Sequence, residues 1–135
     1  MLLQRLFAAP AAQGPGRALY ASAVQQARQP AFYRALGVAD TVEGRFELYS
    51  LHVALLLLRL KGQGQIAAAT AQHLFDAYVL SLDDALRDLG VSDVKVGKKM
   101  KKLGEAFYGR LKSYEDAIEA LPQAEALRTV LSRAT

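Results

Sequence analysis

The chain has 135 residues, of which 52% are hydrophobic and 22% are charged, and its formal net charge is +4. This length and composition are typical of a single folded domain and exclude an intrinsically disordered chain. Cysteine is absent and the only histidines are His52 and His73, which excludes disulfides, thiolate metal sites, iron–sulfur clusters, cysteine nucleophiles and a multi-histidine metal site.

The first 16 residues are predicted to be an N-terminal segment, a short amphipathic helix and a loop, ahead of a main domain at 17–135. The segment contains arginine and no acid, and four apolar residues are spaced as on one face of a helix: Leu2, Leu3, Leu6 and Phe7. The loop is expected at 13–16, around Pro15. Packing of this helix on the domain is the favoured interpretation, and a weak membrane foot is the alternative.

Helical periodicity dominates the rest of the chain. β-branched residues are sparse, strict alternation of apolar and polar residues is missing, and no proline occurs between Pro30 and Pro122. These features predict an all-α fold, a compact single-domain bundle of about six to seven helices. After the N-terminal segment, helices are expected over 17–28, 31–36, 40–61, 66–89, 96–121 and 123–133.

Several residues predict where these helices begin and end. Pro30 suits a first helical turn, and Gly37 suits the position after a helix. An oxygen-bearing side chain followed by an acid, at 40–43, is typical of a helix N-terminus. Gly90 closes the fourth helix, and 91–97 is expected to be a connector, with Ser92 or Asp93 as the cap of the next helix.

Two helices have distinctive apolar patterns. The segment 46–60 is apolar nearly all round, which predicts a central buried helix, and it is too short and too interrupted by charge to span a membrane. The last long helix carries one continuous apolar stripe: Val96, Met100, Leu103, Phe107, Leu111, Tyr114, Ile118 and Leu121.

Basic residues are concentrated beside this stripe. Residues 95–112 hold seven bases against the single acid Glu105, whereas residues 40–90 carry seven acids against four bases. The candidate surface for an anionic partner consists of Lys95, Lys98, Lys99, Lys101, Lys102 and Arg110. Contact with lipid phosphate, RNA or an acidic protein is weighed evenly against a solvated helix face.

Other candidates carry weaker signals. The acids Asp76, Asp83, Asp84 and Asp88 have near-helical spacing, which an exposed acidic face explains better than acid–base or Mg²⁺ chemistry. His73 and Asp76 offer two metal ligands at most, so no metal and no cofactor are predicted. Four aromatic residues are candidate partner contacts or, equally, core residues: Tyr33, Phe46, Phe107 and Tyr108.

Three blocks of this sequence closely resemble the ubiquinol–cytochrome c chaperone family. They are PAFYRALGVADTVEGRFEL at 30–48, LFDAYVLSLDDALRDLGV at 74–91 and VGKKMKKLGEAFYGR at 96–110, and with the spacing between them the resemblance covers most of 19–121. It implies an all-helical, non-enzymatic assembly factor of the cytochrome bc1 complex. The resemblance implies a role like that of the mitochondrial members, which look after newly made cytochrome b near the ribosome exit and the inner membrane, together with a small partner protein.

The lack of a long presequence makes the chain look like a bacterial member, placed at the cytoplasmic face of the inner membrane. The expected partners are cytochrome b or another bc1 subunit and an anionic membrane surface, whereas nucleic acid is not expected beyond the ribosomal contact. Two alternatives stay open. One is a basic helical module that binds membrane or RNA without a cytochrome client, and the other is an enzyme that acts on an isoprenoid or quinone-like substrate.

Overall fold

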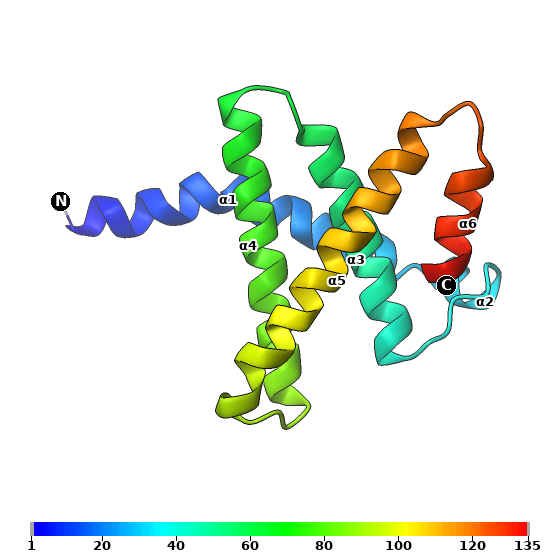
Figure 1. The fold of residues 1–135 in the computed structure, drawn as a ribbon. Helices are drawn as coiled ribbons and strands as arrows, with labels where there is room; N and C mark the ends of the chain where they lie inside the picture. Colours follow the sequence, from blue (N-terminus) through cyan, green and yellow to red (C-terminus); the bar gives the residue numbers. More distant parts are fainter. Residues whose placement is uncertain (1, 135) are drawn as a thin grey trace.

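The structure is a computed structural model that describes the backbone of residues 2–134 and the side chains of residues 14–133. Over this part of the chain the backbone forms six α-helices and no strand (Figure 1). The helices are α1 (Leu2–Ala27), α2 (Pro30–Arg34), α3 (Val42–Leu60), α4 (Gln65–Asp88), α5 (Asp93–Glu119) and α6 (Glu125–Ala134). The prediction of an all-α fold of about six to seven helices is confirmed.

The helix α1 differs from the prediction, because it is continuous through 13–16, where a loop was expected. Glycine and proline disfavour a helix interior, but α4 is the helix that α1 contacts most, and Gly16 lies against it. Gly16 is buried there, and a Cβ atom at this position would lie 2.5 Å from the Cβ of His73. The close crossing needs a glycine inside the helix, so tertiary packing overrides the local signal. The side chains of Leu2, Leu3, Leu6 and Phe7 lie outside the described residues.

Local capping signals placed other boundaries well. Thr41 is the N-cap of α3, and its hydroxyl accepts a hydrogen bond from the backbone N–H of Gly44 at 3.0 Å. Gly37 and Gly90 follow α2 and α4 with φ of 78° and 88°, the left-handed conformation that glycine adopts without strain. The connector expected at 91–97 is shorter, because α5 already begins at Asp93.

The helix α3 lies at the centre of the arrangement and contacts α1, α4, α5 and α6 (Figure 1). The helices α4 and α5 lie close together at a shared turn and diverge from it, and α6 folds back onto α5. The α3–α4 turn and the α4–α5 turn therefore lie at opposite ends of α4. None of the helices within the described residues is long and apolar enough to cross a membrane.

The core is built around Tyr78 of α4. Its ring lies 5.1 Å from the ring of Phe107, centroid to centroid, and its hydroxyl is 2.5 Å from the Oγ of Ser50, a buried polar residue of α3. Tyr20 of α1 packs 6.3 Å from the same ring and donates a hydrogen bond to Ser81. The main cluster of buried residues comprises Ala23, Val53, Ala54, Leu74, Tyr78, Phe107 and Tyr114.

The buried tyrosines predict a loss of stability at high pH. Burial raises the pKa of Tyr78 above its usual value near 10, because the phenolate would have to leave water. The unfolded chain therefore releases this proton at lower pH than the folded chain does. The contribution of Tyr78 to the free energy of unfolding is fully present below pH 10. Above pH 10 the free energy of unfolding falls by about 1.4 kcal/mol per pH unit because of this group alone.

Urea denaturation between pH 8 and pH 11.5 measures this effect. The variant Tyr78→Phe should be less stable at pH 8, since it leaves Ser50 without its partner, and it should show a shallower decline above pH 10. Equal slopes for the wild type and the variant would contradict the assignment to Tyr78.

Candidate partner-binding surface

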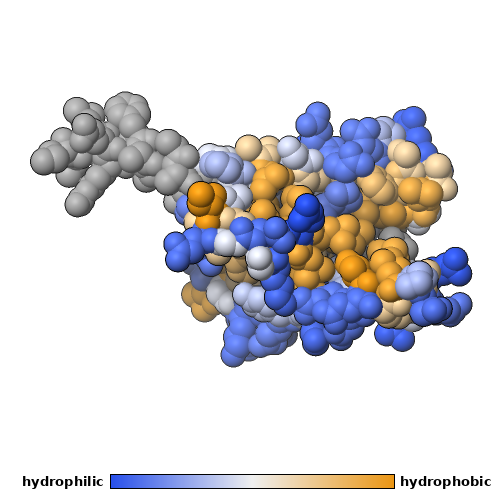
Figure 2. Space-filling model, turned by 90° about the horizontal axis from the view of Figure 1, so that it is seen from above, coloured by the Kyte–Doolittle hydropathy of each residue, from blue (hydrophilic) through white to orange (hydrophobic). Residues whose placement is uncertain are grey.

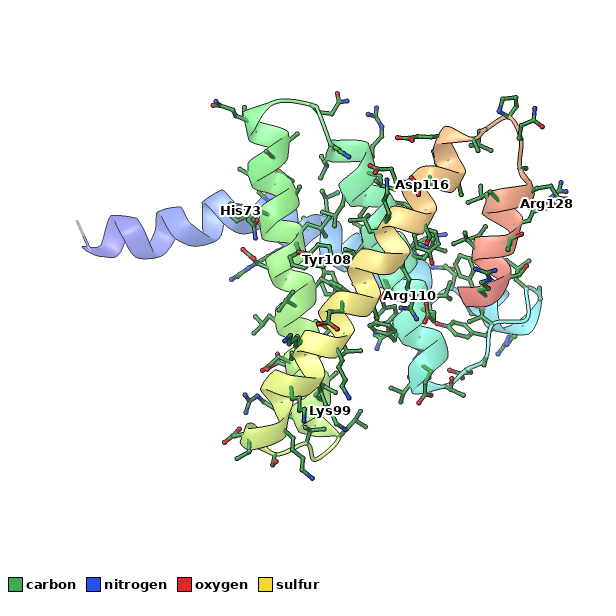
Figure 3. All side chains as sticks on the ribbon, viewed as in Figure 1. His73, Lys99, Tyr108, Arg110, Asp116 and Arg128 are labelled. Carbon is green, nitrogen blue, oxygen red and sulfur yellow. The ribbon has the colours of Figure 1, made fainter. Side chains whose placement is uncertain are left out.

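The lysine face is the exposed side of the first half of α5, and it consists of Lys95, Lys98, Lys99, Lys101 and Lys102. All five side chains are exposed, whereas Val96 and Phe107 on the opposite side of the helix are buried. Among the described side chains, no ion pair holds any of these lysines. Lys98 and Lys102 are one turn apart and Lys95 is adjacent to them, so five positive charges that form no ion pair among the described side chains cover two to three turns of helix, with Glu105 as the acid that follows them one turn later. Figure 3 shows Lys99 near the α4–α5 turn.

Nearby acids do not neutralise this face. Arg87, near the end of α4, donates a hydrogen bond to Asp83 at 2.9 Å and forms a second ion pair with Asp93 at the start of α5. Hydrogen bonds to Asp83 and then Asp93 raise the pKa of Arg87, so its charge persists. The arginine thereby compensates Asp83 and Asp93, two carboxylates near the start of the lysine face, and holds α4 and α5 together at their shared turn.

Arg110 does not join the lysine face, although the sequence grouped it with the lysines. Its guanidinium forms a two-pronged ion pair with Glu47 of α3, in which Nε donates to Oε2 at 2.6 Å, and it lies 5.6 Å from the centre of the Phe46 ring. It also donates to the backbone carbonyl of Ala106. The side chain is 32% exposed and that of Glu47 is 16% exposed, so Arg110 joins α5 to α3 (Figure 3).

The four candidate aromatic residues are placed differently from one another. Phe107 is a core residue and not a surface contact, and Phe46 is partly buried beneath Arg110. Tyr33 is partly buried, and its hydroxyl donates to the carbonyl of Ala27, which fixes α2 against the end of α1. Tyr108 alone of the four presents its ring to solvent, with 58% of the residue exposed.

Tyr108 borders a groove where α3, α4 and α5 meet. The groove has a volume of about 550 Å³ and is lined mainly by apolar side chains, among them Leu57, Leu58, Leu60, Phe75 and Leu111. The ring of Tyr108 lies 5.9 Å from that of Phe75. An ion pair between Lys61 and Glu115, with an N–O distance of 2.6 Å, lies at the rim. Figure 2, which views the molecule from the end that bears the α3–α4 turn, shows a hydrophobic band between hydrophilic margins.

The candidate acids and the two histidines lie in different surroundings. Gln72 donates to Asp76 at 2.8 Å, and Asp83 binds Arg87. His52 Nδ1 lies 2.7 Å from the carbonyl of Leu48, whereas His73 Nδ1 is buried without a hydrogen-bond partner among the described residues (Figure 3). Asp76 and Asp84 line an open groove between α1 and α4, and no three carboxylates or histidines in the described part of the chain are placed to share a metal ion.

Two exposed apolar residues at the α4–α5 turn were missed in the sequence. Leu89 is 62% exposed and Val94 is 90% exposed. The available signal was that Val94 lies off the apolar stripe that begins at Val96, in a helix whose other side faces the core. An apolar residue outside the stripe, among lysines, indicates a surface position.

Comparison with known proteins agrees with the resemblance seen in the sequence. Residues 34–135 match the family model of the ubiquinol–cytochrome c chaperone. A Xenopus laevis protein named ubiquinol-cytochrome-c reductase complex assembly factor 1 is 21% identical over 100 residues. That match takes in 74% of this chain and 50% of the relative, so the chain spans about half the length of that relative.

A solved structure is similar over almost the whole chain. The crystal structure of the Cbp3 homolog from Brucella abortus is 39% identical in sequence and superimposes with a TM-score of 0.83. The similarity covers 99% of this chain and 74% of the other. Because the family model matches most of the chain and this solved relative shares both sequence and fold, the chain belongs to the ubiquinol–cytochrome c chaperone family.

Proposed function

We propose that this protein is a non-enzymatic assembly chaperone of the ubiquinol–cytochrome c reductase (bc1) complex, which binds newly made cytochrome b at the surface of the inner membrane. The observation that carries the proposal is the family match over residues 34–135. The name of the Xenopus laevis relative, an assembly factor of this complex, supports it. The surfaces of α5 suit binding, because they offer uncompensated charge and an exposed aromatic residue.

Two different surfaces serve the proposed binding of the client and of the membrane. The groove bordered by Tyr108 and Phe75 offers apolar area to an apolar segment of the client, with the ion pair of Lys61 and Glu115 at its rim. The lysine face offers positive charge to anionic lipid at the cytoplasmic side of the membrane. Phe107 and Arg110 support these surfaces from within the fold and do not touch a partner themselves.

Deletion of the gene in a bacterium that has a bc1 complex tests the proposal. We expect the membranes to lose the b-type haem spectrum and ubiquinol–cytochrome c activity, and the wild-type chain to restore both. Charge reversal by Lys98→Glu/Lys102→Glu, or replacement of the exposed ring by Tyr108→Asp, should reduce the restored activity several-fold.

The control variant Arg59→Glu/Arg128→Glu reverses the charge of two exposed arginines outside the lysine face. It changes the net charge by the same amount as the lysine variant. It should restore full activity. Unchanged bc1 activity in the deletion strain would overturn the assembly role. Full restoration by the lysine variant would keep the role and reject the lysine face, and full restoration by Tyr108→Asp would reject the groove.

The lysine face also favours one second candidate, a module that binds anionic lipid or RNA without a cytochrome client. Binding through phosphates weakens steeply as salt is raised, whereas an apolar client contact does not. The second candidate therefore predicts salt-sensitive binding together with normal bc1 activity in the deletion strain.

A further inference from the structure

We propose that the α4–α5 tip inserts into the headgroup region of an anionic lipid bilayer. The α4–α5 tip is defined as Leu89 and Val94 with the three lysines nearest Val94 on the outer side of α5, Lys95, Lys98 and Lys101. The inference deepens the membrane contact in the proposed function, since it names the inserting residues and the lipid class.

The two apolar side chains are held outward by the turn itself. Gly90, in the left-handed conformation, donates its N–H to the carbonyl of Arg87, and Val91 donates to that of Leu86, which closes the end of α4 in a Schellman motif. Leu89 is the C-cap within this motif, and Val94 is in the first turn of α5. Arg87 ties the two helices together through Asp83 and Asp93. Leu89 and Val94, which are 62% and 90% exposed, are therefore presented by a hairpin whose two helices are held together by ion pairs.

The lysines follow Val94 along the same side of α5. Lys98 and Lys101 follow Val94 by four and seven positions, which places all three along one line of the helix surface, and Lys95 is adjacent. Each lysine is exposed, and within the described side chains none has an acidic partner within ion-pair distance. Exposed apolar side chains beside a line of lysines are the arrangement of a peripheral anchor on anionic lipid.

An anionic bilayer fits this surface better than RNA or a folded partner does. The tip lies at the end of a hairpin that projects from the bundle (Figure 1). A projecting tip can contact the flat surface of a bilayer more readily than it can form the concave site that binds a folded partner. It carries no aromatic side chain on which a base could stack. Aliphatic side chains gain by leaving water for the acyl boundary, while lysine ammonium groups stay among lipid phosphates.

The opposite end of α4 provides a matched control. Ile66 is 87% exposed, nearly as much as Val94, but residues 62–72 around it carry no charge. Both residues are aliphatic, lie in the first turn of a long helix and are almost fully exposed. They differ in the lysines that lie beside Val94. A comparison of the two positions therefore distinguishes insertion at a basic tip from nonspecific binding by any exposed apolar residue.

Tryptophan fluorescence tests the insertion directly, because the natural chain contains no tryptophan. Full-length variants carrying Val94→Trp or Ile66→Trp are mixed with vesicles of phosphatidylcholine alone or with 30% phosphatidylglycerol. We expect a blue shift and protection from acrylamide for Val94→Trp on the anionic vesicles only, and no change for Ile66→Trp. A shift for both variants, or for neither, would overturn the proposal.

Vesicle cosedimentation at low salt measures the partition coefficient. A lysine close to an anionic surface contributes about fivefold, so Lys98→Gln/Lys101→Gln should lower binding by roughly 25-fold. Leu89→Gln/Val94→Gln should lower it by about tenfold and leave the salt dependence intact, whereas Ile66→Gln should have no effect. Full binding by Leu89→Gln/Val94→Gln would overturn insertion, and so would tight binding to a short single-stranded RNA with none to vesicles.

The vesicle experiments use purified protein and lipid, so their outcome is independent of the outcome of the gene deletion. Normal vesicle insertion together with unchanged bc1 activity would reject the assembly role and keep the tip as a membrane contact. Loss of bc1 in the deletion strain without vesicle insertion would keep the assembly role and reject the tip. Circular dichroism of each variant confirms that exposed substitutions leave the helices intact.

Discussion

The variant Gly16→Ala is expected to lose about 2 kcal/mol of folding free energy, although alanine is the better helix former. A Cβ atom at this position would lie 2.5 Å from the Cβ of His73 and 2.7 Å from the backbone nitrogen of Leu74. Backbone atoms of α4 cannot rotate away as a side chain can, so α1 and α4 must separate. Urea denaturation followed by circular dichroism measures the loss.

Gly14 supplies the control within the same helix. A Cβ atom there would meet nothing within 4 Å, so Gly14→Ala should stabilise the protein by up to about 1 kcal/mol through helix propensity alone. The two substitutions are chemically identical and two residues apart, yet they are expected to change stability in opposite directions. Stabilisation by both would show that α1 does not cross α4 at Gly16.

Removal of Glu47 or Arg110 is the second large effect expected. Either Glu47→Ala or Arg110→Ala should destabilise the fold by about 2 kcal/mol, since each leaves a partly buried charge without its partner. The pair joins α3 to α5 with hydrogen bonds from two guanidinium nitrogens, and the guanidinium also lies over Phe46. The double variant should cost less than the sum of the single ones, with a coupling of about 1–2 kcal/mol by denaturation.

Arg110→Lys serves as the conservative comparison. It keeps the charge and loses the forked geometry, so it should recover only part of the stability. The result also bears on function, because Arg110 was a candidate contact for an anionic partner. If Arg110→Ala weakened vesicle binding without destabilising the fold, its assignment to the ion pair with Glu47 would be wrong and its charge would belong to the binding surface.

The different positions of Arg110 and the lysines separate charge that supports the fold from charge available to a partner. Arg110, Arg87 and Lys61 each hold a carboxylate, so replacing them changes stability as well as charge. The lysines of the lysine face hold none among the described residues, and substitutions there report on binding with little effect on folding. Charge-reversal experiments on this family member are interpretable only when the two groups are kept apart.

The candidate site was partly predictable from sequence. The apolar stripe of α5 placed the lysines outward, because a helix that buries one side must expose the other. The same stripe contains Phe107, so the pattern already indicated a core residue where a surface contact was also considered. Tyr108 lies next to it and off the stripe, and it is the aromatic residue that reaches solvent.

The sequence alone determined the helical class, most helix boundaries and the outward direction of the lysines. These depend on interactions between residues a few positions apart: the cap at Thr41, the left-handed Gly90 and the spacing of apolar side chains. Three short sequence segments, at 30–48, 74–91 and 96–110, also carried the resemblance to the chaperone family.

Only the tertiary structure decided what happens between distant segments. Glu47 and Arg110 are 63 positions apart, and Gly16 meets His73 across two helices, so no local pattern announces either contact. Two results follow from such packing: α1 is continuous through Gly16, and Arg110 is bound to Glu47 instead of joining the lysines. Local propensities of a few tenths to about 1 kcal/mol per residue select helices, and the packing of one helix on another then determines which of their side chains remain available to a partner.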